Sequence, residues 1–164
     1  MREFSSMAAF ATHLVEREVA TVVDLQTGLH RAAKAIETSA KAEIGQYQQS
    51  VGPFPAWEAL ADSTEAEKAR LGYEPDAPLL RTGDLRDSIT HQVEGLDAAI
   101  GSEDQVMVYH EFGTTNMPPR PVLGPAAIHN KHRIEKILGD ALVSGLVGGD
   151  AIHPGLGYGF ETKD

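Results

Sequence analysis

Histidines in the second half of the chain are the first candidates for a chemical site. His129 and His132 lie three residues apart in a segment with helical spacing, and the pair His110-Glu111 precedes them. Two histidines at such a spacing can present two metal ligands on one helix face. The sequence has no His-Glu-x-x-His motif, however, and a histidine pair on a helix is more often a solvated surface. We therefore expect no metal site and no cofactor.

Ser88, His91 and Asp87 supply the residue types of a catalytic triad. A serine nucleophile needs a base within hydrogen-bond reach and a turn that exposes it, and no nucleophile-elbow glycine pattern surrounds Ser88. Adjacent residues of a strand also point to opposite faces. The glycines within residues 155–159 follow no strand and open no helix, so they do not form a phosphate loop. We expect no catalytic residues, and a small enzyme or binding protein of unrelated type remains the competing interpretation.

The composition indicates one folded, acidic protein. Its 164 residues include 24 acidic and 14 basic side chains, a net charge of −10, and 41% of them are hydrophobic. This balance is typical of a globular chain and argues against a surface that grips nucleic-acid phosphates. The absence of cysteine excludes disulfides, thiolate catalysis and cysteine-ligated metals. Without a run of 18 apolar residues, we expect neither secretion nor membrane spanning, and assembly in the cytoplasm.

Apolar and small residues in steps of three and four predict a long helix at the start of the chain. The stripe consists of Val15, Val19, Val22, Leu29, Ala33, Ile36 and Ala40. It lies in a proline-free segment of about residues 5–49. One helix over this length would measure roughly 65 Å, so part of it must project or pack on a neighbour. The β-branched run 21–23 and Gly28 are places at which the segment could instead divide into two helices.

Turn-forming residues and the alternation of apolar with polar residues predict the elements after residue 50. Prolines within residues 51–55 should end the long helix, and Thr64, Glu67 and Gly72 predict a short helix over residues 65–71. Alternation then predicts a meander of about three antiparallel strands. The alternating positions are Ile89, His91 and Val93, then Ala98 and Ile100, then Val106 and Val108. A last helix is expected from Pro125 to the glycines at 148–149.

These elements predict an α+β fold. We expect a long N-terminal helix, a small antiparallel sheet of about three to four strands, and a C-terminal helix packed on that sheet. Residues 1–50 would form an N-terminal helical region and residues 51–147 an α+β core. Residues 148–164 would be a flexible glycine-rich tail.

Three segments between residues 55 and 126 carry a recognisable order of motifs. The first holds Trp57, Leu60, Thr64 and Lys68. The second holds Thr82, Gly83, Leu85, Ser88 and Ile89. The third is a loop with Phe112, Gly113 and Thr114, followed by the proline-arginine-proline motif of Pro118, Pro119, Arg120 and Pro121.

This ordered set resembles the virion-morphogenesis and tail-completion proteins of tailed bacteriophages, which include gpS-like tail completion proteins and HK97 gp10-like neck proteins. Two positions depart from the family pattern: Pro119 stands where alanine is expected, and Val122 where phenylalanine is usual. The long N-terminal helix and the glycine-rich tail lie outside the clear match. The resemblance implies an α+β structural subunit without enzymatic activity.

The resemblance further implies a place at the head–tail junction of the virion. A hexamer or dodecamer ring would sit between the head connector or head-closure protein and the tail terminator or tail tube, after assembly in the host cytoplasm. DNA would pass through the lumen without specific binding, since an acidic lumen repels it. A tail terminator that caps the tail tube is the alternative role.

The proline-rich loop is the candidate surface for contact with subunits or partners. Pro118, Pro119 and Pro121 restrict its backbone, so little entropy is lost on docking, and Arg120 offers five donors. We expect this loop, with Phe112 before it, to be exposed. Packing within the subunit is the competing interpretation, and the long N-terminal helix is a second candidate surface.

Overall fold

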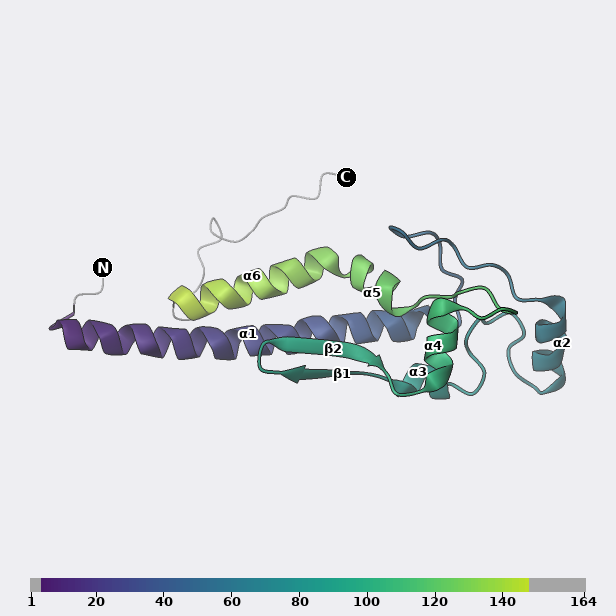
Figure 1. Ribbon diagram of the computed structural model, residues 1–164, viewed down its shortest axis with the longest axis horizontal. Coiled ribbons are helices and arrows are strands. Elements are labelled where there is room, and N and C mark those ends of the chain that lie inside the picture. Colours follow the sequence, from purple (N-terminus) through teal and green to yellow (C-terminus); the bar gives the residue numbers. More distant parts are fainter. Residues whose placement is uncertain (1–3, 148–164) are drawn as a thin grey trace. The chain divides into compact units, whose positions relative to one another are not determined.

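The computed structural model describes residues 4–147. Its elements are α1 (Met7–Glu43), α2 (Asp62–Arg70), α3 (Asp84–Ser88), β1 (Ile89–Glu94), β2 (Asp97–Ser102), α4 (Gln105–Phe112), α5 (Leu123–His129) and α6 (Lys131–Val147), as Figure 1 shows. The α+β class and the long N-terminal helix are confirmed, but the sheet has two strands within the described residues. The predicted tail, residues 148–164, lies outside them. No helix of the described chain combines the length and apolar character needed to cross a membrane.

Helix α1 is continuous over 37 residues, so the alternative of two helices divided at residues 21–23 or at Gly28 is wrong. The Ser6 hydroxyl accepts a hydrogen bond from the Ala9 N–H at 3.1 Å and caps the first turn. At the other end Gly45 adopts φ +93°, and its N–H donates to the Pro78 carbonyl at 2.8 Å. The helix therefore ends before the prolines that were expected to stop it.

The predicted third strand is helix α4. Asp104 Oδ1 accepts from the Val106 N–H at 2.9 Å, which caps a helix rather than extending a strand. The buried residue is Met107, 3% exposed, whereas Val106 and Val108 are exposed. The alternation of the two valines therefore did not mark a strand, because both are exposed on a helix and Met107 between them packs into the core.

The ends of the other helices also differ from the prediction. Helix α2 begins at Asp62, and its N-cap Ala61 makes no side-chain capping bond, so the expected capping box is wrong. The single predicted C-terminal helix is two helices separated at Asn130. The buried Asn130 amide donates to Ser39 Oγ at 2.7 Å and to the Ala126 carbonyl at 2.9 Å.

The chain divides into two compact units. The motif unit comprises Ala33–Gln92 and Ala99–Lys131. The helical unit comprises, within the described residues, 4–32, 93–98 and 132–147. The core of the motif unit consists of Ala40, Ile44, Trp57, Ile89, Met107, Val122 and Ala126.

In the helical unit α1 and α6 approach closely through glycine. A Cβ placed on Gly28 would lie 3.0 Å from the Ala141 Cβ, and one placed on Gly145 would overlap the backbone of Thr21. Gly28 is thus a packing residue of an intact helix rather than a breaker.

Candidate functional site

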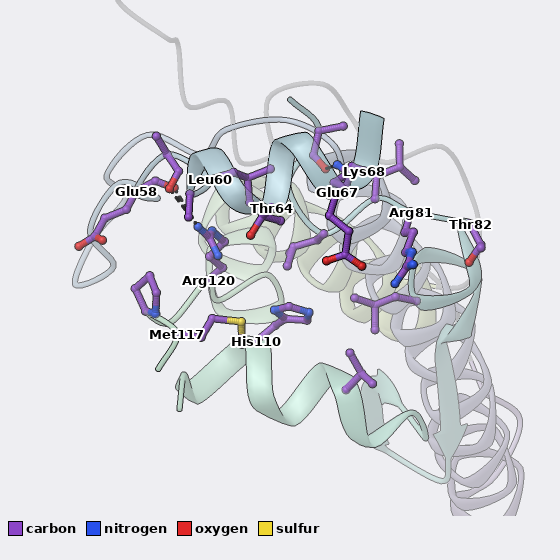
Figure 2. A pocket seen from close by; sticks show the side chains of 18 of the residues that line it. Glu58, Leu60, Thr64, Glu67, Lys68, Arg81, Thr82, His110, Met117 and Arg120 are labelled. Atoms are coloured by element: carbon purple, nitrogen blue, oxygen red, sulfur yellow. Dashed lines mark hydrogen bonds between the residues drawn. The ribbon is translucent and has the colours of Figure 1, made fainter. Parts of the chain in front are cut away.

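The three motif segments meet around one cavity of about 680 Å³ in the motif unit (Figure 2). Its walls come from residues 58–61, α2, residues 77–85, α4 and residues 116–120. The motif residues in its lining are Leu60, Thr64, Lys68, Thr82, Leu85, Pro118 and Arg120. In Figure 2 Glu67 of α2 and His110 of α4 approach the space from opposite sides. Tertiary structure therefore gathers segments that lie far apart in the sequence.

Arg120 is a structural side chain of this cavity. It is 6% exposed, and one guanidinium nitrogen donates to the carbonyls of Glu58 at 3.1 Å and Ala59 at 3.4 Å. The backbone N–H of Arg120 donates to the His110 carbonyl at 2.6 Å. The expectation of an exposed Arg120 is therefore wrong, because the guanidinium satisfies carbonyls of the first motif segment. Pro121 is buried as well, whereas Pro119 is exposed.

His110 faces this cation from α4. Burial and the positive charge of Arg120 lower the pKa of His110, and Asp104 opposes the shift. The ring is therefore neutral at pH 7. His110 Nδ1 and Arg120 Nε are both buried, and neither has a hydrogen-bond partner among the described residues.

Lys68 holds α2 to the segment before the second motif. Its Nζ donates to the Ala77 carbonyl at 2.5 Å, and the side chain is buried. Desolvation by burial lowers the pKa of Lys68, against the charges of Glu74, Asp76 and Glu65. The lysine of the first motif thus positions the cavity wall instead of offering a surface charge.

Trp57 joins the first motif to the third. Its indole Nε1 donates to the Pro121 carbonyl at 3.2 Å, and the residue is 6% exposed. Leu60 is held nearby, since its N–H donates to the Tyr47 hydroxyl at 3.1 Å and that hydroxyl donates to Asp76 Oδ1 at 2.7 Å. These bonds fix the backbone on which the Arg120 guanidinium rests.

The second motif forms a turn, a short helix and the first strand. Gly83, at φ +99°, is the N-cap of α3, and Thr82 Oγ1 donates to Asp84 Oδ2 at 2.7 Å. Leu85 is half-buried against the core and Ile89 is fully buried. Helix α3 was not predicted, because five residues carry too little periodicity to distinguish a helix from a turn.

The third motif needs a glycine where it turns back. Gly113 has φ +73°, and a Cβ there would lie 2.8 Å from the Pro119 nitrogen and 2.9 Å from the Met117 carbonyl oxygen. The Thr114 N–H donates to the Met117 carbonyl at 2.9 Å and closes the loop. Phe112, just before it, is 81% exposed.

An acidic cluster beside the core was not found from sequence. Glu111 Oε1 accepts from the N–H groups of Val122 at 2.8 Å and Leu123 at 2.9 Å, and so caps the start of α5. Glu43 Oε1 pairs with His129 Nδ1 at 3.1 Å. Burial raises the pKa of Glu43 to about 7; His129 opposes this shift and the Glu111 charge adds to it. The partners of both glutamates lie far from them in the sequence, so no local pattern of residues predicts the cluster.

The residues first considered for chemistry have separate partners. Ser88 Oγ donates to the Leu85 carbonyl at 2.7 Å and lies 2.6 Å from Ser102 Oγ. His91 Nδ1 lies 2.5 Å from Glu37 Oε2, and Asp87 pairs with Arg86. They do not form a triad.

The histidines considered as metal ligands, His129 and His132, also have acidic partners of their own. His129 pairs with Glu43, and His132 lies 3.4 Å from Glu135 Oε2. Across residues 4–147 no group of three or more histidine or acidic side chains could hold a metal ion.

Comparison with known proteins gives one match. The model of the phage virion morphogenesis family matches residues 8–143, which include all but the first residue of α1, the three motif segments and most of α6. The expectation that the long N-terminal helix lies outside the match is therefore wrong. No curated protein and no solved structure matches the chain.

Proposed function

The chain belongs to the phage virion morphogenesis family, and from this premise we propose that it is a structural subunit of the neck of a tailed phage. In this role it is a tail completion protein that joins the head to the tail. It forms a ring, a hexamer or dodecamer, between the head connector and the tail. A role in virion assembly follows from the family itself, whereas the position in the neck is the proposal.

The observation that carries the proposal is the motif cavity. Its wall residues are fixed by internal bonds of Arg120 and Lys68, so the cavity is preformed and little entropy is lost when it is filled. Its volume of about 680 Å³ suits a short peptide segment. The cationic side chains of the cavity, Arg120 and Lys68, are used for these internal bonds, which supports docking rather than catalysis.

We infer that a segment of a neighbouring virion protein enters this cavity. The lining offers apolar contacts from Leu60, Val106 and Met117 and charges of both signs from Glu67 and Arg81. Such a mixed lining favours a polypeptide over DNA, whose phosphates require a basic surface. The net charge of −10 per subunit supports a lumen through which DNA slides.

The neck assignment is tested with a phage that carries a stop codon at Trp57. Electron microscopy of its lysate is expected to show filled heads beside free tails of normal length. Overlong tails would instead identify the protein as a tail terminator. Infectious particles with normally joined heads and tails would exclude both roles.

The cavity is tested separately with two neighbouring hydroxyl residues on α2. Thr64 and Ser63 are both exposed, but only Thr64 lines the cavity. Thr64→Arg should occupy part of the cavity and reduce incorporation into particles at least about tenfold, whereas Ser63→Arg should leave incorporation unchanged. Equal incorporation of both variants, with equal melting temperatures, would remove the cavity from the proposal.

A further inference from the structure

The apolar stripe of α1 continues beyond the part that the protein covers itself. In the motif unit Ala33 is 1% exposed and Ala40 is 0% exposed. In the helical unit the same stripe is bare: Val15 is 60% exposed, Val19 is 59% exposed and Val22 is 38% exposed. Exposed apolar side chains in a continuous row mark a contact surface more often than scattered ones do.

The spacing of this row is that of a coiled-coil seam. From Ala8 onward the steps alternate strictly between four and three residues. The seam positions are Ala8, Thr12, Val15, Val19, Val22, Gln26, Leu29, Ala33, Ile36 and Ala40. A repeat of 3.5 residues keeps one face of a helix against a partner helix. The exposed part forms a groove lined by Ala11, Thr12, Val15, Glu16, Val19 and Ala20, which has the form of a hole for a side-chain knob.

We propose that the exposed seam of α1, from Ala8 to Val22, packs in parallel against α1 of a second copy of this chain. A second copy supplies a helix with the same 3.5-residue spacing and the same β-branched side chains. Valines at successive seam positions interlock as knobs in the holes of a facing helix.

The charges beside the seam favour the parallel direction. Glu16 and Glu18 flank the exposed valines on opposite sides. In a parallel pair in register, Glu18 faces Val23 of the other copy and Glu16 faces Ala11, so no like charges meet. In the antiparallel register that pairs Thr12 with Val22 and so overlaps all three valines, Glu18 would face Glu18 and Glu16 would face Glu16. Two like-charge pairs would oppose that arrangement.

The size of the seam sets the strength of the contact. From Ala8 to Val22 the helix rises about 21 Å, only about four turns. Such a contact is smaller than the roughly 1,200 Å² buried by stable interfaces, so it forms reversibly and adds to other contacts. The same seam is used on both copies, so the contact is isologous and pairs two copies about a two-fold axis parallel to α1.

The test uses single cysteines in a chain that has none of its own. Val15→Cys and Val22→Cys lie on the seam, whereas Leu14→Cys is a matched control. Leu14 is 51% exposed against 60% for Val15, but it lies on another face of the helix. The purified full-length variants are treated with a short bis-maleimide at high protein concentration. Covalent dimer is expected at least about tenfold faster at both seam positions than at Leu14.

A second substitution separates a specific contact from random collision. Val19→Asp in the Val22→Cys background should lower the crosslinking rate about tenfold, and Leu14→Asp should leave it unchanged. Equal rates for Leu14→Cys and Val22→Cys would overturn the proposal. So would a Val22→Cys chain that crosslinks with Thr12→Cys but not with itself, because that result identifies an antiparallel pair.

These outcomes are independent of the neck assignment. The crosslinking uses purified protein without phage particles, so a normal phage from the Trp57 stop codon would remove the neck role and leave the helix contact standing. Conversely, free heads and tails together with no seam crosslink would retain the neck role and overturn the helix contact.

Discussion

The two halves of α1 carry the same apolar stripe, but the stripe is buried in one half and exposed in the other. In the motif unit the stripe is sealed into a core with Trp57, Ile89 and Val122. In the helical unit its valines stand in solvent, although α6 approaches the helix through Gly28 and Gly145. A stripe of this kind therefore specifies a helix and an apolar face, but it does not specify whether the cover comes from the same chain.

The largest difference in the free energy of unfolding is expected when one negative charge is placed in each half of α1. Ala40→Asp would bury a carboxylate at a site that is 0% exposed and should reduce the free energy of unfolding by more than about 4 kcal/mol. Val19→Asp, at a site 59% exposed, should change it by less than about 0.5 kcal/mol. Urea unfolding of both variants measures this. A comparable loss in the Val19 variant would mean that the exposed half is also covered within the subunit.

Arg120 gives the next largest effect. Arg120→Ala removes the donor of the Glu58 and Ala59 carbonyls and should cost about 2–4 kcal/mol of stability. Arg81→Ala is the control from the same cavity, because Arg81 is exposed and its guanidinium stacks 5.2 Å from the Tyr73 ring. It should cost less than about 1 kcal/mol. Equal thermal unfolding of the Arg120 variant and the parent would restore the interpretation of Arg120 as a surface contact.

Glu37, on the covered half of α1, makes the stability of that half depend on pH. Its carboxylate accepts from Lys34 at 2.8 Å, pairs with Lys41 at 3.0 Å and contacts His91. These partners, Lys34 foremost, lower the pKa of Glu37 to about 2. Because the folded pKa is below the ordinary glutamate pKa of 4.5, the stabilisation is present above pH 4.5 and is lost as the pH falls toward 2.

Glu37→Gln should therefore cost about 1–2 kcal/mol at pH 7, with solvent screening at the exposed Lys34 keeping the loss small. The difference from the parent should shrink steadily below pH 4.5. Chemical unfolding at a series of pH values measures both. A difference that stays constant from pH 7 to pH 3 would show that Glu37 acts by packing alone.

Glu43 should give the smallest effect, with the opposite sign. Its pKa is raised from 4.5 to about 7, so the folded state binds a proton between these pH values that the unfolded state releases. Stability then falls as the pH rises through this window. Glu43→Gln should stabilise the protein by about 1 kcal/mol at pH 8 and lose that advantage near pH 4.5. Destabilisation at pH 8 would show that the contact with His129 outweighs the cost of burying the charge.

Some of the architecture follows from local sequence alone. The spacing of Val15 to Ala40 predicts α1, the ordered motifs predict the family, and the composition excludes cysteine chemistry. Helix periodicity and motif order are properties of neighbouring residues, so they can be read without knowing any distant contact.

The cavity and the placement of its side chains were decided by tertiary structure. Arg120 meets Glu58 across 62 residues and Trp57 meets Pro121 across 64, and neither pairing leaves a local pattern. The same holds for α4, where burial of Met107 against a distant core overrode an alternation that favoured a strand. The sequence by itself determined the long helix α1, the charge and the motif order. Only the packed chain decided which arginine is buried, where the motifs meet and which half of α1 stays exposed, because burial is a relation between segments and not a property of any one of them.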